Sequence, residues 1–262
     1  MKELIKVFTP NQAVKKSTIA GIVVFQIVLV LLLWIKTSSP LFPKPWEIVK
    51  ALQNLFMRDE FGADLASSIR LSLEAMVDTV IISLLISYAT VLPFFRPLAF
   101  LISKFRFLTL VGLSFVFTII THGGHDLKVW LLVFGMTVFF VTSMVAALKS
   151  IDKLEYNHAR TLKLNEWEVT REIIVFGRLD VVFEVIRQNF AISWMMLTLV
   201  EGISRSEGGI GTMLLNQNKH LNLDSVFAIQ IVILAVGITQ DYIFGILKVI
   251  VCPYSTLSLE KK

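Results

Sequence analysis

Long apolar segments separated by shorter polar ones run along most of the chain. A run of about 20 apolar residues is the length that an α-helix needs to cross a hydrocarbon core about 30 Å thick. We expect six spans, at about 19–35, 71–93, 97–121, 127–148, 180–200 and 225–250. Residues 43–70 are half polar and open with Pro43 and Pro45, so we expect short interfacial helices there. The pattern predicts an all-α polytopic membrane protein.

Composition agrees with this interpretation. The chain has 262 residues, of which 55% are hydrophobic and 17% are charged, whereas soluble domains average about 25% charged residues. The net charge of +5 is typical of loop lysines and arginines and not of a nucleic-acid surface. The single cysteine, Cys252, excludes an internal disulfide and argues against a cysteine-based metal site.

The loop charges predict an orientation. With the N-terminus in the cytoplasm, the cytoplasmic segments carry 15 lysines and arginines and the opposite segments carry 8. An excess of basic residues marks cytoplasmic loops, so we expect both termini there. The predicted organisation is a cytoplasmic segment 1–18, a transmembrane domain 19–254 and a cytoplasmic tail 255–262, with residues 149–178 forming the most basic cytoplasmic loop.

This loop has the pattern of two short helices joined by a turn near Lys163 and Leu164. Asn165 is in position to cap the second helix, and Glu168 stands three residues later, as in a capping box. Glu166 lies in the first turn, where the helix dipole favours an acid. A bent, charged helix pair of this kind suits docking into a groove on a cytosolic partner. The alternative is a solvated amphipathic linker.

The loop also resembles the EAA loop of ABC-transporter permeases of the nitrate, sulfonate and taurine import type. The matching residues are Glu155, Ala159, Arg160, Thr161, Leu162, Trp167 and Ile173. Weaker matches, in the family's order, cover about residues 30–254: the segments 41–45, 64–70 and 123–128, then Arg187, Glu201, Gly208, Gly209, Gly211, Asp241, Pro253 and Tyr254.

The resemblance implies a type I ABC importer permease fold and a transport function. The chain would be no enzyme and would hold no cofactor, because ATP is bound by separate cytosolic ATPase subunits. It implies an inner-membrane location, a second permease copy, a solute-binding protein and a small anionic solute of the nitrate, sulfonate, taurine or bicarbonate class. The expected ATPase-docking residues are Glu155, Ala159, Arg160, Thr161, Leu162, Lys163, Asn165 and Trp167.

The sequence departs from the family pattern at the turn of this loop. Lys163 stands where the family has glycine, and Phe176 and Asp180 replace two prolines before the fifth span. A positive φ angle costs lysine more than glycine. We therefore expect either that Asn165 takes the strained position or that the groove of the ATPase differs.

Two intramembrane charges, Arg187 and Asp241, predict a pair that ties the fifth span to the sixth. Charges in lipid are costly and usually face protein or water. Arg187 could instead bind an anionic substrate or extend to the membrane surface. Glu201 with Gly208, Gly209 and Gly211 is expected at a periplasmic mouth. The alternative is a flexible turn after a helix, and no GK[ST] motif indicates a phosphate loop.

His122 and His125 could suggest a metal site, but a periplasmic turn is the preferred interpretation. Glu74 and Asp78, four residues apart, are expected at a water-facing rim, with a cation path as the alternative. Rival classes for the whole protein are a secondary transporter, for which no internal repeat is found, a membrane enzyme, whose chemistry the four dispersed histidines do not support, and a non-transporting scaffold or regulator with the permease fold.

Overall fold

The computed structural model describes residues 15–36, 42–57, 59–121 and 123–253. In these residues the chain is helical. The longer helices are α2 (Lys16–Lys36), α3 (Pro45–Phe56), α4 (Asp59–Ala89), α5 (Arg96–Lys104), α6 (Leu110–Thr121), α7 (Gly124–Lys149), α8 (Lys153–Thr161), α10 (Leu179–Ile203), α11 (Ile210–Lys219) and α12 (Leu223–Val251). The shorter ones are η1 (Pro93–Phe95), η2 (Phe105–Phe107), α9 (Glu166–Val169), η3 (Thr170–Phe176) and η4 (Arg205–Glu207).

Three of these helices are long and apolar enough to cross a membrane: α2 from Ser17, α7 and α12. A fourth candidate is the bent pair that α4 forms with residues 93–107, whose two parts meet at an angle of 119°. The protein is therefore a helical membrane protein by the length and composition of its helices. The predicted fifth span exists as α10, but it carries Asp180, Glu184, Arg187 and Glu201 and does not qualify on composition.

The prediction of one span over 97–121 is wrong, because the segment is divided into α5, η2 and α6. Leu108 takes an extended conformation after η2. Thr109 then starts a new helix, since its hydroxyl accepts the N–H of Gly112 at 3.3 Å and its carbonyl accepts the N–H of Leu113 at 3.1 Å. A threonine that satisfies free N–H groups at a helix start is a capping signal. It lies inside an apolar run, where hydropathy alone hides it.

Of the short interfacial helices predicted over 43–70, a short helix is present in the first half, and the second half belongs to a long helix. Helix α3 is short and buries Ile48, Ala51 and Leu55. From Asp59 onward the chain belongs to the 31-residue helix α4. Glu60 lies in the first turn of α4, where the helix dipole favours an acidic residue.

Helix α7 forms the centre of the bundle. It packs against α4, α10, α6 and α5, and α10 packs in turn against α12 and α11. Fully buried side chains such as Leu131, Met136 and Phe140 fill these contacts. Helix α2 is different, because none of its apolar window is buried against the described chain. It meets the bundle at one end, where the Trp34 Nε1–H donates to the Pro43 carbonyl at 3.1 Å.

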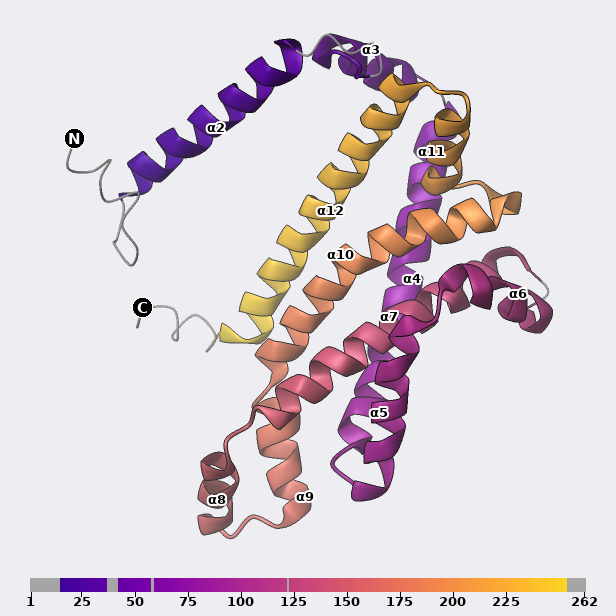
Figure 1. Cartoon of the computed structure of the whole chain (residues 1–262). Coiled ribbons are helices and arrows are strands. Elements are labelled where there is room, and N and C mark those ends of the chain that lie inside the picture. The colour runs from indigo at the N-terminus through magenta and orange to yellow at the C-terminus, as the bar shows by residue number, and fades with distance from the viewer. Residues whose placement is uncertain (1–14, 37–41, 58, 122, 254–262) are drawn as a thin grey trace.

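The loop over 149–178 and the segment with Glu201 and the glycines at 208, 209 and 211 lie at opposite ends of this bundle. Helices α8 and α9 lie at one end, and α3 and α11 lie at the other (Figure 1). The long helices α7, α10 and α12 connect the two ends.

Candidate functional site

The α8–α9 hairpin, residues 152–169, has the helix–turn–helix form that the sequence predicts. Asp152 caps α8 by accepting the N–H of Leu154 at 3.1 Å. Asn165 caps α9 by accepting the N–H groups of Trp167 and Glu168 at 3.0 and 2.9 Å. The Glu168 carboxylate accepts the Asn165 N–H at 2.8 Å. The predicted capping box is confirmed, and both helices of the hairpin have defined starts.

Lys163 occupies the turn position of the hairpin. Its φ is 60°, in the left-handed region, and its N–H donates to the Arg160 carbonyl at 3.0 Å. This is the position after a helix end that glycine usually occupies. Asn165 has an ordinary φ of −74°. The expectation that Asn165 takes the strained position is therefore wrong: lysine adopts the conformation in place of glycine.

Ion pairs hold the hairpin together and fasten it to the bundle. The Arg160 guanidinium donates to both oxygens of Glu166, at 2.9 and 3.2 Å, and so joins the two arms. This hydrogen bonding lowers the pKa of Glu166 below its ordinary value. Arg178, just before α10, donates to Glu155 at 2.6 Å. Two predicted docking residues, Glu155 and Arg160, are thus engaged inside the chain, by partners that the sequence analysis did not identify.

Three apolar side chains of the hairpin are largely exposed. The exposed fractions are 72% for Leu154, 64% for Leu162 and 70% for Trp167. Ala159 is 6% exposed and is packed inside the hairpin, and the Thr161 hydroxyl donates to the carbonyl of His158. Of the apolar predicted docking residues, Leu162 and Trp167 therefore have side chains that are available to a partner. Leu154 was missed, although its apolar character in a polar helix is a usable signal.

Arg187 and Asp241 form the predicted pair between α10 and α12. Two hydrogen bonds join them, at 3.0 and 2.8 Å. Arg187 also contacts Glu184 at 3.3 Å, and Lys248 donates to Glu184 at 3.0 Å. The pair is therefore part of a four-residue network. Glu184 lies three positions before Arg187 on the same helix face, which is a spacing that predicts contact.

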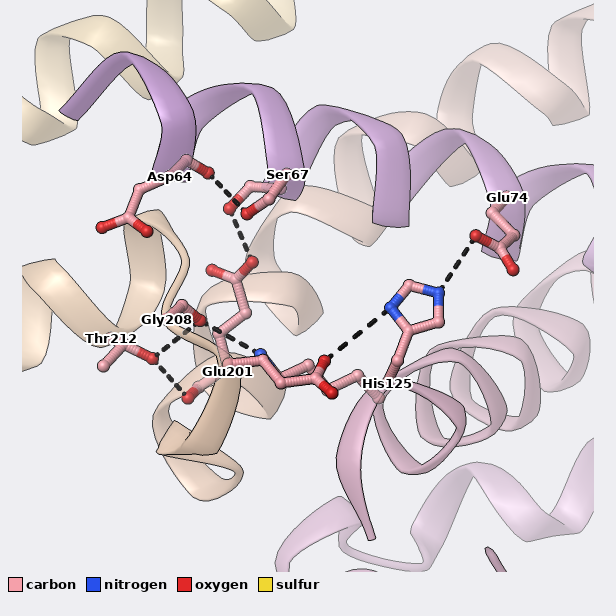
Figure 2. Close-up of polar contacts among 10 residues, drawn as sticks. Asp64, Ser67, Glu74, His125, Glu201, Gly208 and Thr212 are labelled. Atoms are coloured by element: carbon pink, nitrogen blue, oxygen red, sulfur yellow. Dashed lines mark hydrogen bonds and ion pairs between the residues drawn. The ribbon is translucent and has the colours of Figure 1, made fainter. Parts of the chain in front are cut away.

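A buried glutamate organises the opposite end of the bundle. Glu201, near the end of α10, is 1% exposed. One oxygen of its carboxylate accepts the Ser68 hydroxyl at 2.6 Å and the other accepts the Gly211 N–H at 2.7 Å. Figure 2 shows this carboxylate reaching from α10 to α4. A Cβ atom at Gly209 would overlap the Glu201 carboxylate, so a glycine is needed at this close approach.

The glycine segment 208–211 is fixed and not a loose turn. The Asp64 carboxylate accepts the Gly209 N–H at 3.1 Å, and the Ser68 hydroxyl accepts the Ile210 N–H at 2.9 Å. The Lys128 ammonium, on a side chain that is almost fully buried, donates to the Gly208 carbonyl at 3.0 Å. These hydrogen bonds argue against the alternative of a flexible turn. Asp64, Ser68 and Lys128 come from α4 and α7, far from this segment in the sequence.

His125 forms a polar contact with two acids beside this segment. Its Nε2 lies 3.1 Å from Glu74, and its Nδ1 lies 3.9 Å from Glu207 (Figure 2). No group of three or more histidine, cysteine or acidic side chains that could hold a metal occurs in the part of the chain that the structure describes. His122 lies outside the described residues. The Glu74 side chain is 43% exposed, and Asp78 is half-buried.

Comparison with known proteins adds no family assignment. A scan against protein-family models and a search of curated proteins found no match to this chain. The functional argument therefore depends on the residues and on their arrangement.

Proposed function

We propose that this protein is the transmembrane permease subunit of an ABC importer. The observation that carries the proposal is the α8–α9 hairpin. It projects at one end of an apolar helix bundle (Figure 1) and exposes Leu154, Leu162 and Trp167. Its sequence resembles the segment with which such permeases bind their ATPases. Tryptophan is among the residues that most often anchor protein interfaces.

In this proposal the hairpin transmits motion and has no chemical role. ATP is bound and hydrolysed by cytosolic partner subunits, and the chain itself needs no cofactor. The hairpin is braced within itself by Arg160 and Glu166 and is tied to α10 through Glu155 and Arg178. A displacement of the tip would therefore reach α10 directly. A switch between two packed arrangements is the usual way in which a ligand at one site biases a distant one.

The charged network of α10 and α12 supports a second permease copy. The Asp241 side chain is 53% exposed in the single chain, and that of Glu184 is 41% exposed. Charges facing lipid are costly, so such groups usually face protein or a water-filled path. We propose that this face lines or flanks a solute path between two copies. The solute is proposed to be a small anion of the nitrate, sulfonate, taurine or bicarbonate class.

The proposed location is the inner membrane, with both termini in the cytoplasm. The end with Glu201 and the fixed segment 208–211 would then face the periplasm. A rigid surface there suits a solute-binding protein, since binding to a preformed surface avoids the cost of ordering it.

The docking claim can be tested by co-purification with the ATPase. Glu155 and Arg160 are poor test positions, because changing them would also break ion pairs inside the chain. Leu162→Glu is better, since Leu162 is 64% exposed. Loss of an interface anchor costs about 2 kcal/mol or more. We expect the ATPase to bind at least tenfold more weakly.

The matched control is Met57→Glu. Met57 is 82% exposed and follows α3, at the opposite end of the bundle (Figure 1). This variant should retain the ATPase. If Leu162→Glu also retains the full ATPase stoichiometry and transport, the docking proposal is wrong.

The scaffold alternative was motivated by the missing turn glycine. Lys163 adopts the left-handed conformation with a φ of 60°, so the premise that the turn is lost no longer favours it. A purified complex that contains the ATPase but transports no solute would support the scaffold alternative. Solute uptake without any ATPase would instead indicate a secondary transporter.

A further inference from the structure

A cavity of about 560 Å³ separates the α8–α9 hairpin from the helices above it. Its walls come from three places: the turn and helix that follow α4, the end of α7, and the inner side of the hairpin. Thr90, Arg96 and Phe100 belong to the first wall. Lys149 belongs to the second, and Tyr156 belongs to the third. The proposed docking of the ATPase uses the outer side of the hairpin and does not involve this cavity.

Positive charge dominates the polar part of the cavity. Arg96, Lys149 and Arg160 line it, whereas Glu166 is the acid that lines it. Glu166 already pairs with Arg160. Among the described residues, neither Arg96 nor Lys149 has a carboxylate within ion-pair distance; the Arg96 Nε–H donates to the Thr90 carbonyl at 3.3 Å. The cavity therefore holds two cations without a counterion from the described chain.

Apart from Glu166 and the Tyr156 hydroxyl, the rest of the wall is apolar or already satisfied. Phe100, Leu148 and Ile174 contribute apolar surface. The hydroxyls of Thr90 and Thr170 donate to carbonyls of their own segments. The donors that remain for a ligand are thus chiefly the cations. A ligand that fits must carry a strong anionic group and tolerate an apolar neighbourhood.

We propose that this cavity binds the phosphate group of an anionic ligand. A carboxylate has two oxygens, and a single arginine can donate to both. A phosphate group has three acceptor oxygens, so it can accept hydrogen bonds from cations on two different walls at the same time. Two sources share this chemistry: the headgroup of an anionic phospholipid and a free phosphate ion. Basic pockets between transmembrane helices on the cytoplasmic side are typical sites for lipid headgroups. Bound phosphate would bridge α5 and α7 to the hairpin and restrain it.

Native mass spectrometry of the purified full-length protein tests the proposal. The probes are a short-chain phosphatidic acid, inorganic phosphate and the matching diacylglycerol, which lacks phosphate. Wild-type protein should bind at least one of the two phosphate probes and not the diacylglycerol. Binding of phosphatidic acid alone assigns a lipid, and binding of inorganic phosphate assigns a soluble anion.

The variant Arg96→Gln/Lys149→Gln should weaken that binding at least tenfold, because charge-assisted hydrogen bonds are among the stronger polar contacts. In the described part of the chain the Lys149 side chain has no hydrogen bond or ion pair that Lys149→Gln would remove. This single variant should still bind the phosphate probe clearly more weakly than the wild type. Lys153→Gln/Arg171→Gln is the control. It removes the same charge from α8 and η3, at positions outside the cavity, and should bind like the wild type.

Hydrogen exchange gives an independent readout, since the bound probe should slow exchange in residues 153–161 of the wild type and not of the Arg96→Gln/Lys149→Gln variant. The proposal is overturned if neither phosphate probe binds. It is equally overturned if the control loses as much binding as the cavity variant, because the attraction would then come from general surface charge. None of these measurements needs the ATPase, so they stand apart from the test of docking.

Discussion

Lys163 has the least favourable backbone conformation of the hairpin. Its φ of 60° is a conformation that costs an L-residue roughly 1–2 kcal/mol. Glycine avoids that cost but loses about 0.5–1 kcal/mol of conformational entropy on folding. The two effects nearly cancel. A lysine is therefore compatible with this turn, at the position where the permeases that the loop resembles have glycine.

We predict that Lys163→Gly leaves the hairpin as stable as in the wild type or slightly more stable. Lys163→Val should weaken it by about 1–2 kcal/mol, because a β-branched residue fits a positive φ poorly. Asn165→Val should cost about 1 kcal/mol for another reason, the loss of the cap on α9. Hydrogen exchange across residues 153–169 measures each effect. Lys153→Val, at the exposed start of α8, serves as the control. Equal protection in the valine and glycine variants at 163 would contradict this account.

Glu201 shows how far a sequence identifies a buried site. The residue and the glycines 208–211 are close in the chain, and the resemblance places them together. Their partners Ser68 and Lys128 could not be found in this way, because Ser68 lies 133 positions away from Glu201. A serine in an apolar helix has many possible roles, and only packing brings this one to the carboxylate. Local chemistry was predictable here, and the tertiary contacts were not.

At the scale of elements, helix boundaries were predictable where neighbouring residues signal them and not elsewhere. The start of α9 was predictable, because Asn165 and Glu168 form a capping box from neighbouring residues. The break before α6 was not, because the cap at Thr109 lies inside an apolar run that fits one span. Hydropathy reports which residues avoid water. It does not report whether the backbone continues straight through them.

The contact between α10 and α12 gives an element-scale prediction. Arg187 pairs with both Asp241 and Glu184, and Glu184 also pairs with Lys248. Asp241→Ala leaves Arg187 with Glu184, whereas Arg187→Ala removes the one ion-pair partner that Asp241 has in the described chain. We expect Arg187→Ala to lower the thermal stability more than Asp241→Ala does.

The double variant should cost less than the sum of the single ones, by about 0.5–3 kcal/mol, as for residues in one network. The measurement is thermal unfolding of the purified protein in one detergent. Gln26→Ala, on the exposed helix α2, is a control that touches neither helix. Equal losses from the two single variants, or strict additivity, would show that the network does not act as described.

At the scale of the whole molecule, the membrane character was predictable and the number of spans was not. Helices α2, α7 and α12 were found as long apolar runs. Helix α10 carries Glu184 and Arg187, which pair with α12, and Glu201, which accepts a hydrogen bond from α4, so its composition is not that of an apolar span. Helix α2 has the opposite character: it is strongly apolar, and within the described part of the chain its contact with the bundle is near Trp34. Its surface suits lipid or another protein chain.

The last prediction concerns which end of the molecule faces the cytoplasm. The excess of basic residues predicts that the α8–α9 hairpin lies inside and α11 outside. Cys252 is the one cysteine of the chain and is buried, so a Cys252→Ser background is suitable for labelling. In whole cells, a membrane-impermeant maleimide should label Lys219→Cys, at the end of α11. Lys153→Cys, at the start of α8, should be labelled only after permeabilisation. Both side chains are exposed, so access to the reagent decides the result. The reverse pattern would place the hairpin where no ATP is available, and it would contradict the permease proposal even if the hairpin bound a partner.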